Sequence, residues 1–154
     1  MTPDTGSDSP ILIAYDGSDH AKAAIEQAAA HLRIPRAAIV LSVFEPLTAI
    51  PFWGAPYGRV PNEVVEEAAK EAQRVAAEGA ALAKDAGFDS DSAVVEGTPV
   101  WERIVAVAKD RAAGIIVMGS HGRSGVSYVA LGSVATAVAH HAAVPVLICR
   151  AAGN

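Results

Sequence analysis

The sequence predicts an α/β domain in which a parallel, five-stranded sheet carries helices on both faces. Short apolar runs alternate with longer segments of helical periodicity along its 154 residues. Strict alternation with short connections favours parallel strand pairing and a doubly wound sheet. The apolar runs are continuous rather than alternating with polar residues, which is typical of strands covered on both faces. A hydrophobic content of 51% is sufficient for one compact core.

Five segments are predicted to be strands. Pro145 suits the start of the last one, because proline donates no hydrogen bond to a neighbouring strand. The polar residues 1–9 predict a tail ahead of a single domain that spans residues 10–152. The strand segments are Ile11–Tyr15, Ala38–Phe44, the weaker Ser92–Val95, Ile115–Met118 and Val144–Cys149.

Four segments between these strands are predicted to be helices. Ser18 and Asn62 are expected to cap the first and second helices, and Pro99 lies in the first turn of the third. The second helix has an apolar stripe opposite a charged face. The helical segments are Asp19–Arg33, Asn62–Ala86, one that starts at Thr98-Pro99, and one from Gly132-Ser133 to about His141.

Composition argues against several classes of protein. Twelve Lys and Arg residues against 17 Asp and Glu give a net charge of −5, which argues against nucleic-acid binding, because a basic patch usually leads it. No stretch approaches the roughly 18 apolar residues of a membrane-spanning helix, and the polar N-terminus does not resemble a signal peptide. A cytoplasmic location is therefore expected. The single cysteine, Cys149, excludes an internal disulfide and should be buried, and no metal site is predicted.

Two segments directly follow predicted strands, at the edge where open parallel sheets bind ligands. Asp16-Gly17-Ser18 follows the first strand, and Gly119–Gly132 follows the fourth. Asp16 could accept hydrogen bonds from an adenine amino group or from ribose hydroxyls. The alternative is that Asp16 is a turn residue in the Asp-Gly-Ser sequence.

The second segment has the features of an anion-binding loop. Gly119, Gly122 and Gly125 are spaced three residues apart, which lets backbone N–H groups approach a phosphate. The first N–H groups of the helix that begins at Gly132-Ser133 also favour an anion, and Arg123 could add positive charge. Alternatively, the glycines form a tight loop without a ligand and Ser133 only caps the helix.

The spacing Gly119-x2-Gly122-x9-Gly132-Ser133 is similar to the G-2x-G-9x-G-(S/T) nucleotide motif of the universal stress protein family. The resemblance covers nearly the whole chain, from residues 11–18 to residues 144–148, and residues 95–99 also resemble the family's segment before its third helix. It implies the strand order 3-2-1-4-5 and ATP binding. Mg²⁺ could accompany the ATP. Family members respond to stress or growth arrest, and the resemblance implies a nucleotide sensor or regulator.

The resemblance also implies a role for each motif position. Ala14 and Val43 would lie near the base, and Asp16 would meet the adenine or the ribose. The residues that would line the ribose and phosphates are Met118, Gly119, His121 and Gly122. At the helix terminus, the phosphates would be held by Gly132, Ser133 and Val134. The family further implies homodimers, commonly through the last strand, Val144–Cys149, whose apolar edge needs covering.

Other nucleotide and phosphate folds fail on particular residues. A Rossmann dehydrogenase requires G-x-G-x-x-G after the first strand, where this chain has residues 16–20, and a P-loop NTPase requires Gly-Lys-Ser/Thr, which is absent. A receiver domain requires an aspartate at the end of the third strand, which here ends in Val95-Glu96-Gly97.

Two alternatives to a nucleotide sensor stay open. One is a slow ATP hydrolase of the same fold, assisted by His121 or Ser133; His121 is the one histidine expected in the site, and with no partner base evident, turnover should be slow or absent. The other is an interaction module that uses Phe52 and Trp53 in the proline-rich stretch Glu45–Pro61, a stretch that could equally be a lid over the ligand.

Overall fold

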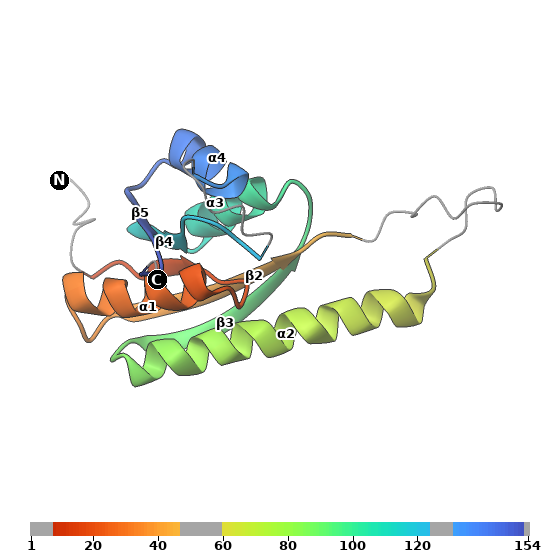
Figure 1. Ribbon diagram of the computed structural model, residues 1–154, viewed down its shortest axis with the longest axis horizontal. Helices are drawn as coiled ribbons and strands as arrows, with labels where there is room; N and C mark the ends of the chain where they lie inside the picture. The colour runs from red at the N-terminus through yellow and green to blue at the C-terminus, as the bar shows by residue number, and fades with distance from the viewer. Residues whose placement is uncertain (1–7, 47–59, 124–130, 153–154) are drawn as a thin grey trace.

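A computed structural model describes residues 8–46, 60–123 and 131–152. These residues form a parallel sheet of five strands in the order β3-β2-β1-β4-β5 (Figure 1). The predicted fold class and strand order are therefore confirmed. The elements in chain order are β1 (Ile11–Ala14), α1 (Asp19–His31), β2 (Ala37–Phe44), α2 (Asn62–Asp85), β3 (Asp89–Glu96), α3 (Val100–Asp110), β4 (Ile115–Gly119), α4 (Ser133–His141) and β5 (Val146–Cys149).

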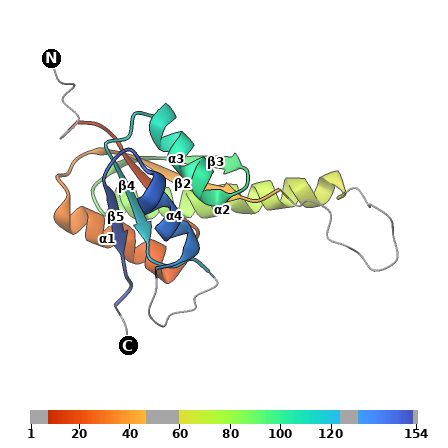
Figure 2. The same cartoon turned by 90° about the horizontal axis from the view of Figure 1, so that it is seen from above.

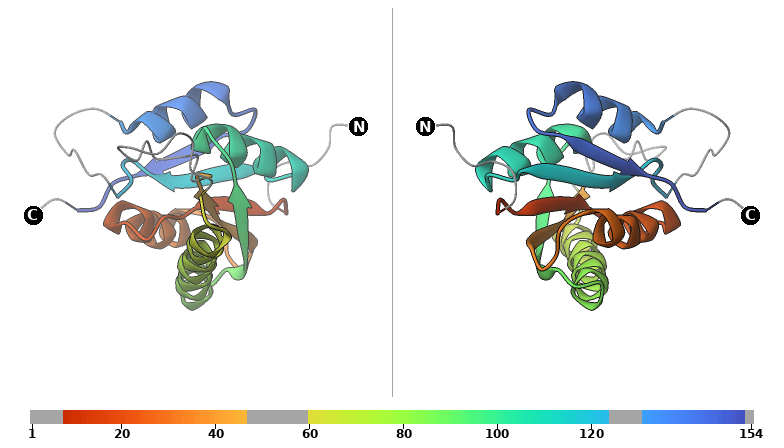
Figure 3. Two further views of the ribbon diagram at one scale, coloured as in Figure 1. Left: turned by 90° about the vertical axis from the view of Figure 1, so that its right-hand side faces the viewer. Right: turned by 90° about the vertical axis from the view of Figure 1, so that its left-hand side faces the viewer.

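Helices cover both faces of the sheet, as the alternation of elements predicts (Figure 3). On one face, α1 contributes Ala24 and Ile25, and α2 contributes Val75, to a cluster built on β1 and β2. On the other face, Ile104 of α3 and Val138 of α4 belong to a second cluster. The first turns of α2 extend past the ends of the strands (Figure 2). Within the described ranges, no helix is both long and apolar enough to cross a membrane.

Several boundaries differ from the sequence prediction for identifiable reasons. β3 is longer than Ser92–Val95, because its first residues pair with β2 in register from Asp89 onward. β5 begins at Val146, and Pro145 instead offers its carbonyl to the N–H of Ile116. The expected cap of α2 is wrong: Pro61 occupies the N-cap position, and Asn62 is the first helical residue. The predicted cap of α1 is confirmed, since Ser18 Oγ accepts a hydrogen bond from the Ala21 N–H at 3.2 Å.

Cys149, the last residue of β5, is a free thiol that is 2% exposed in the α1–α2 cluster. Desolvation raises the pKa of this thiol above its usual range. Cys149 is therefore a small core residue, as the sequence predicts, and its thiol is held in the protonated form.

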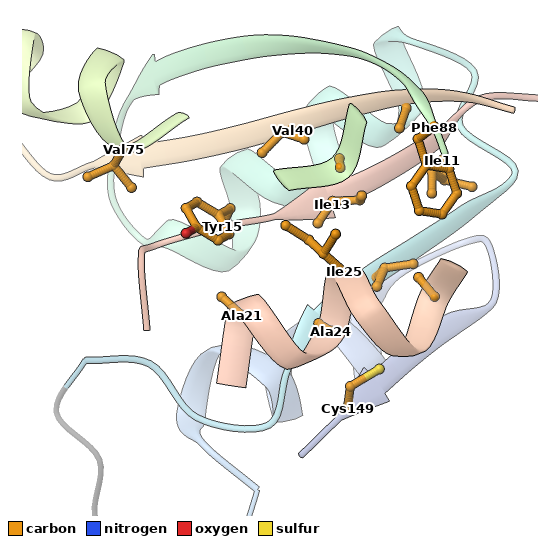
Figure 4. Packing of buried hydrophobic residues seen from close by; sticks show 14 residues of the cluster. Ile11, Ile13, Tyr15, Ala21, Ala24, Ile25, Val40, Val75, Phe88 and Cys149 are labelled. Carbon is orange, nitrogen blue, oxygen red and sulfur yellow. The ribbon is translucent and has the colours of Figure 1, made fainter. Parts of the chain in front are cut away.

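Tyr15, the residue after β1, is packed between α1 and α2, and its ring lies near Val75 (Figure 4). α2 passes this ring at Gly79. A Cβ atom on Gly79 would lie 2.6 Å from Tyr15 Cδ1 and 2.8 Å from Val40 Cγ1. The glycine therefore sets how closely α2 can approach the sheet, in the middle of a helix where alanine would otherwise be preferred.

The Tyr15 hydroxyl donates a hydrogen bond of 2.6 Å to Glu78 Oε1. Burial, followed by this hydrogen bond, raises the pKa of Tyr15 well above its usual range. The same hydrogen bond, supported by Lys22 and Arg74, lowers the pKa of Glu78. Both shifts favour the pair made of a neutral phenol and a charged carboxylate.

We expect Tyr15→Phe to reduce the free energy of unfolding near neutral pH, because the hydrogen bond to Glu78 is lost. The loss should be only about 1 kcal/mol, because Glu78 is partly exposed and solvent weakens this hydrogen bond. The lowered pKa of the Glu78 carboxyl stabilises the fold at pH values above the pKa of this group in the unfolded chain, and this stabilisation is lost as the pH falls. The raised pKa of the Tyr15 phenol stabilises the fold below about pH 10, and this stabilisation is lost as the pH rises. Urea unfolding of both proteins across pH should therefore give a difference that is largest between about pH 5 and 9. A difference independent of pH would contradict this account.

Candidate functional site

The two segments singled out in the sequence meet at the carboxyl edge of the sheet. Arg123 Nε donates a hydrogen bond of 2.6 Å to the carbonyl oxygen of Asp16. A Cβ atom on Gly122 would lie 2.8 Å from Asp16 Oδ2. The loop after β1 and the loop after β4 are thus in direct contact, although Asp16 and Arg123 are 107 positions apart in the sequence.

The two carboxylate oxygens of Asp16 have different surroundings. Its Oδ1 accepts a hydrogen bond of 2.9 Å from the Ser18 N–H, and Gly17 between them has φ of +80°. This is the turn role that the sequence left open. Its Oδ2 faces Gly122 so closely that a Cβ there would lie 2.8 Å from that oxygen. The turn therefore fixes the carboxylate and directs one oxygen toward the backbone of the second loop.

Arg123 is oriented by the first loop. Besides its Nε contact with Asp16, its Nη2 lies 3.6 Å from the position of a Cβ on Gly17. The guanidinium is exposed and retains further N–H donors on the solvent side. It links the loops and brings positive charge to their junction.

Four apolar residues of the predicted site share the hydrophobic cluster on the α3–α4 face of the sheet. Met118 is 5% exposed, so its side chain belongs to the core and its main chain is what it can present at the edge. The other three are partly buried and belong to the ends of β1 and β2 and to the start of α4. They are Ala14, Val43 and Val134.

Gly119, the last residue of β4, lies against the first turn of α1. A Cβ there would be 2.7 Å from the backbone carbon of His20 and 2.9 Å from the Ala21 nitrogen. The contact is between two backbones, so no side-chain rotation could relieve it. This glycine therefore has a packing role whether or not a ligand binds.

Gly132 has a similar role at the start of α4. Its N–H donates to the carbonyl of Ser120 at 2.8 Å, and a Cβ would lie 2.9 Å from the same oxygen. Gly132 occupies the N-cap position and Ser133 is the first helical residue, so the alternative in which Ser133 caps the helix is wrong. The Ser133 side chain is exposed at the helix terminus and available to an anion.

His121 does not stand alone, contrary to the expectation from the sequence. Ser120 Oγ lies 3.0 Å from His121 Nδ1 and 3.3 Å from His20 Nδ1. The ring centroids of His20 and His121 are 5.4 Å apart. Sequence reasoning missed His20 and Ser120. Their positions in the sequence could have indicated them, because His20 follows the turn after β1 and Ser120 directly follows β4.

The described residues hold no group of three or more His, Cys, Asp or Glu side chains that could bind a metal ion. A shallow hollow runs along α4 and touches the predicted site only at Ser133; beside it the Trp101 and His141 rings stack at 4.3 Å. The hollow is lined by Ser133, Thr136, Ala137, Ala139, His140 and His141.

Some predicted features lie outside the described residues. Gly125 belongs to the segment 124–130, and Phe52 and Trp53 belong to the segment 47–59. The expected lid or partner surface over Glu45–Pro61 therefore stays a prediction.

Comparison with known proteins identifies the family of the chain. The sequence model of the Universal stress protein family matches residues 9–150. A universal stress protein from Thermus aquaticus, encoded in the 3′ region of a QAH/OAS sulfhydrylase gene, is 35% identical over 142 residues, which cover 91% of this chain and 97% of the relative.

Solved structures show the same fold. The structure of MJ0577 from Methanocaldococcus jannaschii matches with a TM-score of 0.76 and 25% identity, covering 97% of this chain and 100% of that one. The universal stress protein from Archaeoglobus fulgidus in complex with dAMP matches with a TM-score of 0.61 and 25% identity, over 92% and 97% of the two chains. A more distant Arabidopsis thaliana member, solved with AMP bound, has a TM-score of 0.63 and 14% identity over 94% and 93%. With a family match from residue 9 to residue 150, this chain belongs to the universal stress protein family.

Proposed function

We propose that this protein binds an adenine nucleotide, with ATP as the ligand, and acts as a nucleotide sensor or regulator rather than as an enzyme. The observation that carries the proposal is the contact between the two loops, in which Asp16 Oδ2 faces Gly122 across the carboxyl edge of the sheet. The Archaeoglobus fulgidus relative in complex with dAMP supports the class of ligand.

The residues present fit a nucleotide. Partly buried apolar side chains at the ends of β1 and β2, Ala14 and Val43, offer a surface for the base beside the Asp16 carboxylate. Gly122, which has no Cβ, brings the backbone of the second loop close to that carboxylate, and the first turn of α4 offers free N–H groups and the Ser133 hydroxyl. Adenosine would occupy the Asp16 side and the phosphates would occupy the Ser133 side, with Mg²⁺ bound to the phosphates.

Ser120 and His121 resemble a nucleophile and a base in their spacing, with 3.0 Å between Ser120 Oγ and His121 Nδ1. Ser120, however, is 0% exposed, so its hydroxyl has no access to a ligand phosphate. This burial argues against Ser120 as a nucleophile, and the hydrolase alternative is left with His121 or Ser133. Slow hydrolysis assisted by His121 is the second candidate, and steady phosphate release that is lost in His121→Ala would favour it.

We also propose that the protein forms a homodimer through β5. β5 lies at one edge of the sheet, and its Val146, Leu147 and Ile148 are only partly buried. An apolar edge strand leaves backbone groups that a second copy could pair with. Sedimentation of the purified protein tests this, and a cytoplasmic location stays a prediction from the sequence.

The ligand can be identified directly. Freshly purified protein is denatured, and the released small molecules are separated by chromatography and identified by mass. Stoichiometric ATP supports the proposal, and ADP alone favours the hydrolase. If nothing is released, a calorimetric titration with Mg-ATP and with cyclic AMP decides whether the site binds either nucleotide.

Asp16→Asn should lower the affinity for the nucleotide by about 10- to 100-fold, because a hydrogen bond to a charged acceptor contributes roughly 1.5–3 kcal/mol. Asparagine keeps Oδ1 for the Ser18 N–H and removes the negative charge, so the turn should persist. The measurement is calorimetric titration of both proteins.

Asp19→Asn is the matched control for Asp16→Asn. Asp19 is exposed, lies three residues away at the start of α1, and loses the same charge on substitution. Its affinity should stay within about twofold of the wild type. Equal affinities in Asp16→Asn and Asp19→Asn would remove Asp16 from the site.

A further inference from the structure

Three consecutive residues at the end of β5 are hydrogen-bonded to the region of the proposed site. The Cys149 carbonyl accepts from the Ser120 N–H at 2.7 Å. The Arg150 carbonyl accepts from Gln27 Nε2 at 2.7 Å, and the Ala151 N–H donates to His20 Nδ1 at 2.9 Å. Two residues of α1, His20 and Gln27, and the residue after β4 thus hold the chain where it leaves the sheet edge.

His20 has a defined role in this arrangement. Because the Ala151 N–H is a donor, His20 Nδ1 must be an acceptor, and the neutral ring then carries its proton on Nε2. The ring nitrogen has one lone pair, which the Ala151 N–H occupies at the shorter distance. Ser120 Oγ, at 3.3 Å from the same nitrogen, is the weaker contact.

The Ser120 hydroxyl is therefore directed to the other ring. It lies 3.0 Å from His121 Nδ1 and is completely buried between the two imidazoles. With His20 Nδ1 occupied, the hydroxyl proton is free to point at His121 Nδ1. In that arrangement His121 Nε2 carries a proton and can donate a hydrogen bond to a ligand.

We infer that His20 is a positioning residue. By accepting from the Ala151 N–H it holds the end of β5, and with it the Cys149 carbonyl that fixes Ser120 next to His121 in the nucleotide site. The inference rests on the proposed nucleotide binding and adds a regulation to it. Nucleotide affinity and the order of residue 151 are coupled through the acceptor nitrogen of one histidine. Coupling of this kind is reciprocal, so bound nucleotide holds Ala151 more firmly.

Two substitutions separate the acceptor from the shape of the ring. His20→Leu keeps most of the side-chain volume and removes the acceptor, whereas His20→Asn is smaller but keeps an oxygen near the position of Nδ1. His31→Ala is the control on the same helix, because His31 is exposed and its Nδ1 lies 2.9 Å from the Gln27 carbonyl oxygen, within the same helix. All three variants are first compared with the wild type by thermal unfolding.

The first measurement needs no ligand. In His20→Leu, amide exchange of Ala151 should be at least about tenfold faster than in the wild type. His20→Asn and His31→Ala should keep the wild-type exchange rate at Ala151. The inference is wrong if Ala151 exchanges in His20→Leu at the wild-type rate. It is also wrong if His20→Leu keeps the wild-type rate and His20→Asn does not.

The second measurement is the nucleotide affinity. His20→Leu should bind ATP about tenfold more weakly and His20→Asn like the wild type, and ATP should slow Ala151 exchange in the wild type but not in His20→Leu. A wild-type protein that binds no nucleotide overturns the proposed function, and this inference with it. A His20→Leu variant that folds and binds like the wild type overturns the inference alone.

Discussion

Gly79→Ala is expected to lower the free energy of unfolding by about 2–3 kcal/mol, although alanine is the better helix former by roughly 1 kcal/mol. The added methyl would lie 2.6 Å from the Tyr15 ring and 2.8 Å from Val40, and both neighbours are buried. α2 must move away from the sheet to accept it. Urea or thermal unfolding measures the loss, which should lower Tm by about 5–10 °C for a chain of this length.

Ala81→Leu is the control for this substitution. Ala81 is exposed, two residues further along α2, and the larger side chain would extend into solvent. Its stability should stay within about 0.5 kcal/mol of the wild type. A Gly79→Ala protein that is as stable as the wild type would show that helix propensity outweighs the contact with Tyr15.

Gly119→Ala is expected to affect both stability and binding. Its methyl would meet the backbone of His20 and Ala21 at 2.7 and 2.9 Å, so the first turn of α1 must shift from β4. We expect a loss of about 1–3 kcal/mol in unfolding free energy and a loss of nucleotide affinity of at least about tenfold, because that turn holds both His20 and the cap that follows Asp16.

Gly122→Ala separates these two effects. Its methyl would meet Asp16 Oδ2, a side-chain atom that a small rotation of the carboxylate about its Oδ1 hydrogen bond can move. Stability should therefore stay within about 0.5 kcal/mol of the wild type while the nucleotide affinity falls. Unchanged stability in Gly119→Ala would contradict the backbone contact as the reason for glycine at the end of β4.

Apolar patterning predicted the architecture because the central strands are buried on both faces. The runs at β1, β2 and β4 lie in the sheet interior, where nearly all side chains are apolar; the buried Ser42 of β2 donates its hydroxyl to the Tyr15 carbonyl. β3 lies at an edge of the sheet, so Asp89 and Asp91 face solvent. These polar residues are the reason that the sequence did not predict the first half of the strand. The end of α1 was also placed too late, since Leu32 is already extended with φ of −99° and ψ of 153°.

The candidate site was predictable where function follows chain position. Residues directly after parallel strands meet at one edge, and Asp16, Gly122 and Arg123 do so. The histidine pair was not predictable, because it depends on α1 packing against β4 at Gly119 and on where the chain leaves β5. Neither feature has a local signature in the sequence.

The seam between β1 and β4 is the narrowest part of the sheet interior. Only three residue pairs join these strands, from Ile11 with Ile115 to Ile13 with Val117, whereas eight pairs join β2 and β3. The chain winds away from this seam in opposite directions, with β2 and β3 on one side and β5 on the other. A nucleotide bound to Asp16 and to Ser133 would span the seam and brace the two halves of the domain, so occupancy would decide how readily they come apart.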